Sequence, residues 1–332
     1  MRLPAIAQRH RMSIPDHHPY PFDPTYGFSL EALRAIRPPA AWPGFNAFWQ
    51  ARYDRALGQG TAPRLSAGRA GQAGWRVHDI TYRSADDFQI GGWLLVPEGK
   101  KIRRGLVVGH GYGGREQPDF DLPVAETAVL FPCFRGLSRS RHPPISEAPA
   151  WHVLHDIDQP DRYILGGCVE DLWAAVSVLT ELYPQVDGKI GYSGESFGGG
   201  IGALAIPFDP RIDRGMLTVP TFGNIPVWLT LPTTGSGDAV QRYALAHPEV
   251  RETLRFFDSG TAASEIAIPM LIAVARFDPA VAPPCQFSVA NALPVAEHHE
   301  IVVLDAGHFD YDGMEQQQAM LSEKVSAFFM VE

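Results

Sequence analysis

The pentapeptide GESFG at residues 194–198 places Ser196 between two glycines, where the character of the chain changes. The segment before it, residues 189–193, is short and mostly apolar, which predicts a strand. Residues 197–206 after it are rich in small side chains and predict the start of a helix. Glycine has no Cβ, so the chain can turn sharply here and the helix can pass close to the strand. The sequence therefore predicts a strand–turn–helix with Ser196 at its tip; the alternative is a glycine-rich turn with an incidental serine.

The length and composition of the chain fit one large α/β domain with insertions. Its 332 residues are 45% hydrophobic, which is enough for a sizeable buried core. Acidic residues outnumber basic ones by 37 to 28, and the formal net charge of −9 argues against a nucleic acid partner. No apolar run reaches the roughly 18 residues that a membrane span needs, so we expect no membrane segment.

The three cysteines, Cys133, Cys168 and Cys285, are scattered and odd in number. Their spacing matches no metal site and no disulfide framework, so we expect buried free thiols in a reducing, cytoplasmic setting. No metal or organic cofactor is predicted. Residues 1–22 hold no continuous apolar stretch, which argues against a secretory signal. A processed, secreted form is the alternative.

The pattern along the chain predicts an N-terminal extension, residues 1–74, and a main domain, residues 75–332. In the extension, apolar spacing predicts short helices at 29–36 and 45–57 that pack on the core. A connector rich in Gly and Ala follows at residues 58–74. The extension is therefore expected to add helices to the main domain.

The main domain opens with a predicted antiparallel hairpin, residues 75–82 and 89–96, and then alternates short apolar strands with helices. The longest predicted helix covers residues 162–182. This alternation is typical of a mostly parallel, doubly wound sheet with helices on both faces. Residues 220–265 interrupt it with several prolines and polar amphipathic stretches. We expect these residues to form a small cap over the carboxyl ends of the strands.

A serine hydroxyl becomes a good nucleophile when a base takes its proton and an acid orients that base. Two residues downstream of Ser196 fit these roles. Asp278 follows a predicted strand that ends at Ala275, and His308 follows another that ends at Leu304. Sites in open α/β sheets collect at these carboxyl ends. The sequence therefore predicts a catalytic triad of Ser196, His308 and Asp278.

Other residues compete for the roles of base and acid. Asp305 lies three residues before His308 and is the rival acid, although a turn-capping role suits it better. His247 lies in the predicted cap. His298 and His299 lie at the start of a strand, which is the wrong end of the sheet.

An oxyanion hole needs two backbone N–H groups that point to one place. The residue after the nucleophile, Phe197, supplies one. The second is expected from the loop at residues 110–114, which reads HGYGG and follows a predicted strand. Tyr112 is the natural donor there, and its ring is expected to wall the site. The alternative is a plain glycine turn after a strand.

Segments spread over nearly the whole chain resemble the acetyl xylan esterase and cephalosporin C deacetylase group of α/β-hydrolases, carbohydrate esterase family seven. The matching segments are LEALR at 30–34, FNAFW at 45–49, HGY at 110–112, FRG at 134–136, GESFGG at 194–199, TLRFFD at 253–258, Asp278 with the prolines at 283–284, and GH at 307–308. The resemblance implies the α/β-hydrolase fold and the same triad and oxyanion donors. It also implies that Pro232, in the cap, lies near the acyl pocket. Phe197, Tyr112 and Pro232 are thus the expected substrate-binding residues.

Three positions depart from the family pattern. RGQG reads RGLS at residues 135–138, the Gln after the nucleophile is Phe197, and the Glu after the catalytic histidine is Phe309. No departure removes a catalytic group, because the oxyanion donor at 197 is backbone. All three make the surroundings of the pocket more apolar. Arg135 is expected to be a structural ion-pair anchor beneath the site.

Triad and resemblance together predict a serine esterase that removes short acyl groups, acetyl first, from sugars or related small molecules through an acyl-enzyme. One alternative is another α/β-hydrolase, of peptidase-like or dienelactone type, although roughly seventy residues before the strands are too few for a peptidase propeller. The other is a non-catalytic α/β-hydrolase that serves as a binding module. The resemblance also implies a ring-shaped hexamer, so we expect a homo-oligomer.

Overall fold

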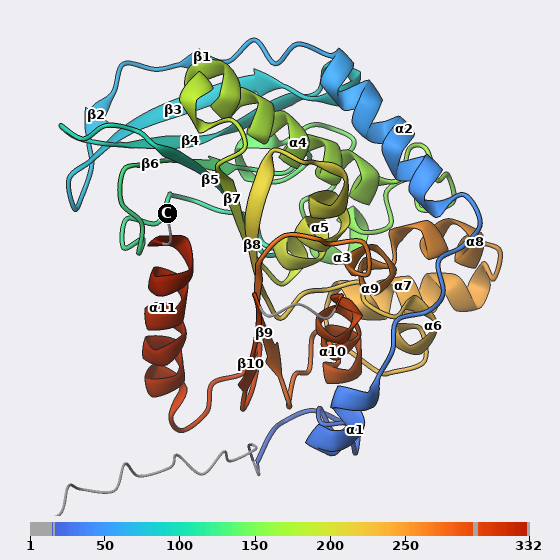
Figure 1. The fold of residues 1–332 in the computed structure, drawn as a ribbon. Coiled ribbons are helices and arrows are strands. Elements are labelled where there is room, and N and C mark those ends of the chain that lie inside the picture. The colour runs from blue at the N-terminus through green and yellow to red at the C-terminus, as the bar shows by residue number, and fades with distance from the viewer. Residues whose placement is uncertain (1–14, 16, 295–297, 331–332) are drawn as a thin grey trace, which may run out of the picture.

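A ten-stranded sheet forms the centre of the computed structural model, which describes residues 15, 17–294 and 298–330 (Figure 1). The strands run in the order β1-β3-β4-β6-β5-β7-β8-β9-β10, and β2 pairs with β3. They are β1 Arg64–Leu65, β2 Arg69–Ala70, β3 Trp75–Arg83, β4 Gln89–Pro97, β5 Arg104–Gly109, β6 Thr127–Pro132, β7 Ile190–Glu195, β8 Ile212–Thr218, β9 Met270–Ala275 and β10 His299–Leu304. Strands β5 to β10 pair with one another in parallel, whereas β1 to β4 pair antiparallel, and β4 joins the parallel part through an antiparallel pairing with β6. The predicted hairpin and the mostly parallel sheet are confirmed.

Helices surround this sheet, and their bounds are α1 Leu30–Ala35, α2 Phe45–Gly58, α3 Pro149–His152, α4 Ile164–Leu182, α5 Phe197–Ala205, α6 Ile225–Trp228, α7 Ser236–Ala246, α8 Val250–Leu254, α9 Ser259–Ala263, α10 Pro283–Ala292 and α11 Met314–Met330. The helices expected at 29–36, 45–57 and 162–182 are observed as α1, α2 and α4. Every helix within the described ranges is too short or too polar to cross a lipid bilayer. Residues 1–14, which bear most of the argument against a secretory signal, lie outside the described residues.

The two faces of the sheet bury two separate apolar clusters, because side chains alternate along a strand. In β5, Val107 joins the larger cluster, and its neighbours Leu106 and Val108 join the smaller one. The larger cluster fills the space under α2, α4, α5, α9 and α10, with Trp49 and Trp173 fully buried at its centre. This face supports the start of α5, where the predicted nucleophile lies.

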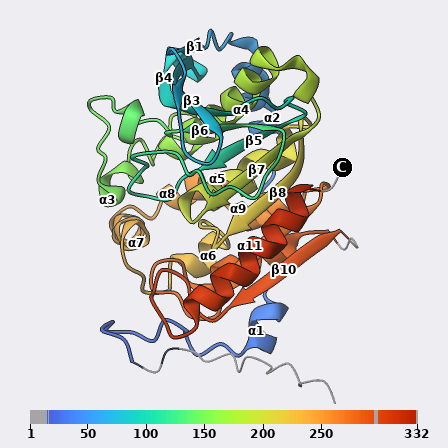
Figure 2. The same cartoon turned by 90° about the vertical axis from the view of Figure 1, so that its left-hand side faces the viewer.

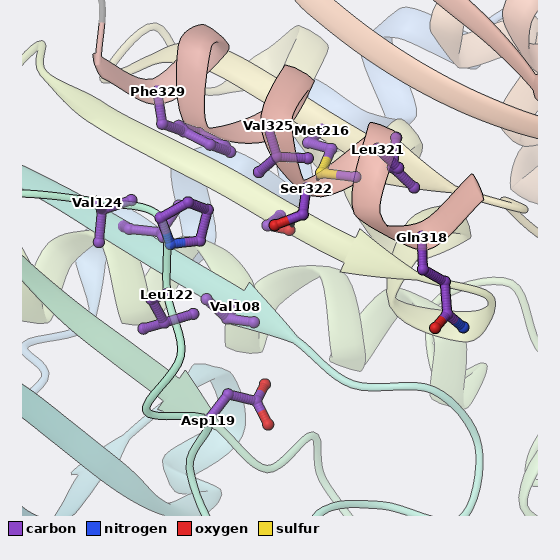
Figure 3. Close-up of a pocket in the computed structure, with 13 residues that line it drawn as sticks. Val108, Asp119, Leu122, Val124, Met216, Gln318, Leu321, Ser322, Val325 and Phe329 are labelled. Atoms are coloured by element: carbon purple, nitrogen blue, oxygen red, sulfur yellow. Dashed lines mark hydrogen bonds between the residues drawn. The ribbon is translucent and has the colours of Figure 1, made fainter. Parts of the chain in front are cut away.

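The opposite face carries α11, which lies across the front of the sheet in Figure 2. The connection between β5 and β6, residues 110–126, contains no helix. Leu122 and Val124 from this connection, with Leu321 and Phe329 from α11, therefore enclose a mainly apolar hollow of about 290 Å³ (Figure 3). No histidine is among the residues that line it.

The N-terminal segment adds strands as well as helices to the main body. Residues 58–74, expected to be a connector, contain β1 and β2, both of which pair antiparallel with β3. Asn291 in α10 donates to the carbonyl oxygens of Leu33 and Ile36 and so attaches the end of α1 to α10. Two-residue strands leave too short a pattern for sequence periodicity to detect.

Residues 220–265 form the expected interruption of the α/β alternation and contain α6 to α9. Helix α7 packs against α3, which belongs to the connection between β6 and α4. The insertion therefore contacts this connection. Its last helix, α9, packs instead against α5 and α10 in the larger cluster. The division at residue 74 and the cap boundaries stay predictions.

Candidate active site

Ser196 lies at the sharp turn between β7 and α5, with φ 53° and ψ −113°. This backbone conformation is sparsely populated for a residue with a side chain, and surrounding structure must hold it. The Ser196 N–H donates to the carbonyl of Thr218 in β8 at 2.8 Å, and its carbonyl accepts from Gly200 at 3.0 Å. The turn is therefore fixed by the neighbouring strand and by its own helix.

The flanking glycines leave no room for a side chain. A Cβ on Gly194 would lie 2.6 Å from the carbonyl oxygen of Gly198, and a Cβ on Gly198 would lie 2.9 Å from that of His110. The close approach that the pattern predicted is thus observed on both sides of Ser196.

Three side chains from three different loops form one hydrogen-bonded chain. His308 Nε2 lies 2.9 Å from Ser196 Oγ, and His308 Nδ1 lies 2.8 Å from Asp278 Oδ2. Asp278 follows β9 and His308 follows β10, so both lie at the carboxyl edge of the sheet, as does Ser196 after β7. The structure brings together the serine, base and acid that the sequence predicted. The rival Asp305 is buried, and it is Asp278 that bonds the imidazole.

The carboxylate of Asp278 is fully buried and held at both oxygens. Oδ1 accepts from the N–H groups of Ala280 and Val281, each at 2.9 Å. Oδ2 accepts from the Gln286 amide at 2.8 Å in addition to His308. A Cβ on Gly307 would lie 2.5 Å from Oδ2, so only glycine fits beside it. These contacts set the direction from which Asp278 meets the imidazole.

Gln286 was missed by the sequence reasoning. It is fully buried in α10; its amide nitrogen donates to Asp278 and to the Val281 carbonyl, and its oxygen accepts from the Ala275 N–H at 2.7 Å. The only sequence signal is its place eight residues after Asp278, at the start of a helix.

We expect Gln286→Ala to lower both stability and activity. Removing the amide leaves the buried Ala275 N–H without its acceptor and Asp278 with one donor fewer, which costs about 2 kcal/mol or more. Urea unfolding should show this loss, and kcat should fall about tenfold because the acid is held less firmly. Gln286→Glu keeps the shape but replaces the amide that donates to Asp278 with a second carboxyl group, so it should lower kcat at least as far. Unchanged stability and kcat in Gln286→Ala would show that Gln286 does not support Asp278.

Opposing effects set the pKa of His308. Burial disfavours the imidazolium and lowers the pKa, whereas the charge and hydrogen bond of Asp278 raise it, and Glu195 adds a smaller upward effect. The net result is a pKa above the ordinary histidine value. Because a base must be neutral to accept a proton, activity should depend on this ionisation.

We therefore expect kcat/KM for a neutral ester to rise with pH through one ionisation. The midpoint should lie above the ordinary histidine value of about 6.5, with a plateau into mild alkali. Initial rates between pH 5 and 9 at constant ionic strength measure it. A flat profile, or a midpoint below the ordinary value, would contradict the raised pKa of His308.

The loop at residues 110–114 passes directly beside the serine. An ideal Cβ on Gly111 would lie 3.8 Å from the Ser196 Cβ. The loop is anchored by buried His110, whose Nδ1 meets the Gly111 carbonyl at 2.8 Å and whose Nε2 accepts from the Phe134 N–H at 3.0 Å. Burial lowers the pKa of His110 to about 4, so its ring stays neutral and can accept this bond.

Two backbone N–H groups near Ser196 are available to a ligand. The Tyr112 N–H has no acceptor among the described residues. Phe197 is the first residue of α5, where an N–H has no carbonyl one turn earlier in the helix. These are the two donors that the sequence predicted for an oxyanion hole, and the role stays a prediction.

The Phe197 ring lies in the core and not in the pocket. It is fully buried, stacks on the Tyr112 ring at 4.1 Å between centroids, and meets Phe134 and Phe222 edge-on. The Tyr112 hydroxyl lies 3.3 Å from His152 Nδ1. The aromatic departure at 197 thus packs beneath the loop at residues 110–114 and does not itself line the pocket.

The departure at residue 138 also supports this loop. Ser138 has φ 50°, and its hydroxyl accepts from the Arg115 N–H at 2.8 Å, close under Gly114. Arg135 forms the expected buried ion pair, with bonds of 2.7–3.1 Å to Asp171.

A pocket of about 380 Å³ opens above Ser196 and His308. Its walls come from the loop at residues 110–114, from α3, from the loop after β9 and from the cap; the cap supplies Trp228 and residues 234–237. Tyr112 lines this pocket as expected. Pro232 does not: it is exposed, and its carbonyl accepts from the Tyr26 hydroxyl at 2.7 Å. The chain turns outward at Pro232, so Trp228 and the 234–237 turn take the place expected for it.

Within the described ranges, no three His, Cys, Asp or Glu residues lie close enough to hold a metal ion together. The three cysteines are free and buried, as expected.

Solved structures share this fold. An acetyl xylan esterase from Paenibacillus sp. R4 has a TM-score of 0.77 at 21% identity, covering 90% of this chain and 99% of its own. Acetyl xylan esterase 1 from Thermoanaerobacterium sp. JW/SL YS485 has a TM-score of 0.74 at 18% identity, covering 92% and 99%. An esterase from Pyrococcus furiosus has a TM-score of 0.54 at 17% identity, covering 81% and 97%. The chain has the α/β-hydrolase fold.

The family model described as acetyl xylan esterase (AXE1) matches residues 24–326. This span includes the extension helices, the cap and all three members of the hydrogen-bonded chain. The chain therefore belongs to the acetyl xylan esterase family and is a carboxylic ester hydrolase.

Proposed function

We propose that this enzyme hydrolyses short acyl esters, acetyl above all, through an acyl-enzyme on Ser196. The continuous chain from Ser196 Oγ through His308 to Asp278, with bonds of 2.9 and 2.8 Å at the base of the pocket, carries this proposal. His308 Nε2 takes the serine proton as Oγ bonds to the ester carbonyl carbon. Asp278 holds the imidazole in the tautomer with Nδ1–H and stabilises the imidazolium that forms.

The remaining steps use the same groups. The tetrahedral oxyanion is stabilised by the N–H groups of Tyr112 and Phe197 and by the positive end of α5. His308 then gives its proton to the leaving alcohol as the carbon–oxygen bond breaks. Water, deprotonated by His308, attacks the acyl carbon; the bond from that carbon to Ser196 Oγ then breaks, the carboxylic acid leaves, and His308 returns the proton to Oγ. The substrate is a small-molecule ester, and the mechanism requires no cofactor.

We expect kcat/KM to fall as the acyl chain grows from acetate to butyrate and to fall steeply by octanoate. The pocket of about 380 Å³ must hold both halves of the ester between Tyr112, Phe222 and Trp228. Each methylene that does not fit costs about 1–3 kcal/mol of overpacking. A series of p-nitrophenyl esters, read by the release of p-nitrophenol, measures this. A maximum at octanoate or longer would refute the short acyl pocket.

Acetylated xylo-oligosaccharides are the first natural substrates to test, because the family and two of the similar structures carry acetyl xylan esterase in their names. Release of acetate from these sugars, compared with phenyl acetate, separates a sugar deacetylase from a general acetylesterase.

The oligomeric state and the compartment follow from other features. We propose a homo-oligomer, supported by the family resemblance, and light scattering coupled to size exclusion measures its mass. We propose a reducing, cytoplasmic setting, supported by the three buried free thiols.

A further inference from the structure

Glu195 lies directly before the nucleophile and faces the same pocket. It is the last residue of β7, its side chain is exposed, and it lines the pocket together with Ser196 and His308. The serine mechanism uses no group at this position. The Cα of Glu195 is held in place, because Gly194 and Glu195 pair with β8 and Ser196 is hydrogen-bonded to β8 and α5.

The one basic side chain that lines the pocket is His308, whose pKa Glu195 helps to raise and which must be neutral to act as the base. No Lys or Arg is among the residues that line the pocket. In the described part of the chain, no Lys, Arg or His forms an ion pair with Glu195. The pocket also presents the aromatic residues Tyr112, Phe222 and Trp228. Aromatic faces attract cations, so the aromatic and acidic walls favour the same kind of ligand.

We propose that Glu195 is a specificity-determining residue that favours esters with a cationic alcohol half and disfavours those with an anionic one. This inference rests on the proposed esterase function. The acetyl group is small and uncharged, so discrimination by charge acts on the alcohol half, which reaches the open side of the pocket. The same carboxylate disfavours acidic acetyl esters.

A pair of esters with the same shape isolates the charge. Acetylcholine carries a quaternary, positively charged nitrogen where 3,3-dimethylbutyl acetate has a neutral quaternary carbon. A third ester, 4-acetoxybutanoate, carries a negative charge. We expect Glu195→Gln to lower the kcat/KM ratio of acetylcholine to its neutral isostere about three- to tenfold at low salt, and to raise the anion-to-neutral ratio. Added NaCl should shrink the wild-type preference for acetylcholine, because Glu195 is exposed and salt weakens the attraction between charges that solvent reaches.

Glu265→Gln is the matched control, because it removes the same charge from an exposed side chain outside the pocket. It should leave both ratios unchanged. Ratios in Glu195→Gln equal to those of the wild type, or a control that shifts them as much, would overturn the inference. If either result is found while the wild type hydrolyses 3,3-dimethylbutyl acetate, only the inference about Glu195 is wrong, and the proposed esterase function is unaffected. A wild type that hydrolyses p-nitrophenyl acetate but none of these three esters overturns this inference alone, and one that hydrolyses neither p-nitrophenyl acetate nor acetylated sugars overturns the proposed function with it.

Discussion

Ser196→Ala should lower kcat for p-nitrophenyl acetate by about four orders of magnitude or more while the fold stays intact. The variant removes the oxygen that attacks, and among the described residues no other hydroxyl donates to His308 Nε2, which lies 2.9 Å from Ser196 Oγ. Because serine, base and acid act as a unit, adding His308→Ala to Ser196→Ala should cost little more. Thermal unfolding followed by circular dichroism checks that the variants fold.

Ser193→Ala is the matched control for this experiment. Ser193 lies three residues earlier on β7, but it lines the hollow under α11 on the other face of the sheet. Its loss should leave kcat near the wild-type value. Near-full activity in Ser196→Ala would show that another residue is the nucleophile.

Asp278→Asn should lower kcat by about three to four orders of magnitude. The N–H groups of Ala280 and Val281 both donate to Oδ1, so an asparagine keeps its carbonyl oxygen there. Its amide nitrogen then faces His308 Nδ1 and the Gln286 amide, which are both donors in the wild type. The imidazole must switch tautomer to accept from the new amide, and Nε2 then carries a proton and cannot take the one on Ser196.

Asp305→Asn distinguishes the two acids, since Asp305 is equally buried and lies three residues from the base. We expect a mild effect on kcat, with any loss confined to stability. Rates of both variants on the same neutral ester, measured at the pH plateau, give the comparison. A severe loss in Asp305→Asn beside a mild one in Asp278→Asn would exchange their roles.

The sequence was sufficient for the features that local chemistry sets. The strand–turn–helix around Ser196 follows from the glycines and the change of pattern, and the observed positive φ agrees with it. Asp278 and His308 could be predicted because each directly follows an apolar strand, and parallel strands end at one edge. The parallel registers of β8, β9 and β10 supply that edge.

Features set by tertiary packing could not be predicted. Whether the Phe197 ring enters the pocket or the core depends on the space between Tyr112 and Phe134, which belong to other loops. The position of Pro232 depends on how the cap folds back over the strands, and spacing within the chain does not encode this. Gln286 meets Asp278 only because α10 packs against β9. Each of these requires knowing which distant segments become neighbours.

Covalent labelling of the nucleophile tests the account most directly. Diethyl p-nitrophenyl phosphate phosphorylates a serine that is activated by a triad and positioned beside an oxyanion hole. Intact-mass spectrometry of the wild type should show the mass of one diethylphosphoryl group, peptide mapping should place it on Ser196, and esterase activity should disappear in proportion. Ser196→Ala should take up no label. Stoichiometric labelling at another residue, or full inactivation with Ser196 unmodified, would contradict the assignment of Ser196 as the nucleophile.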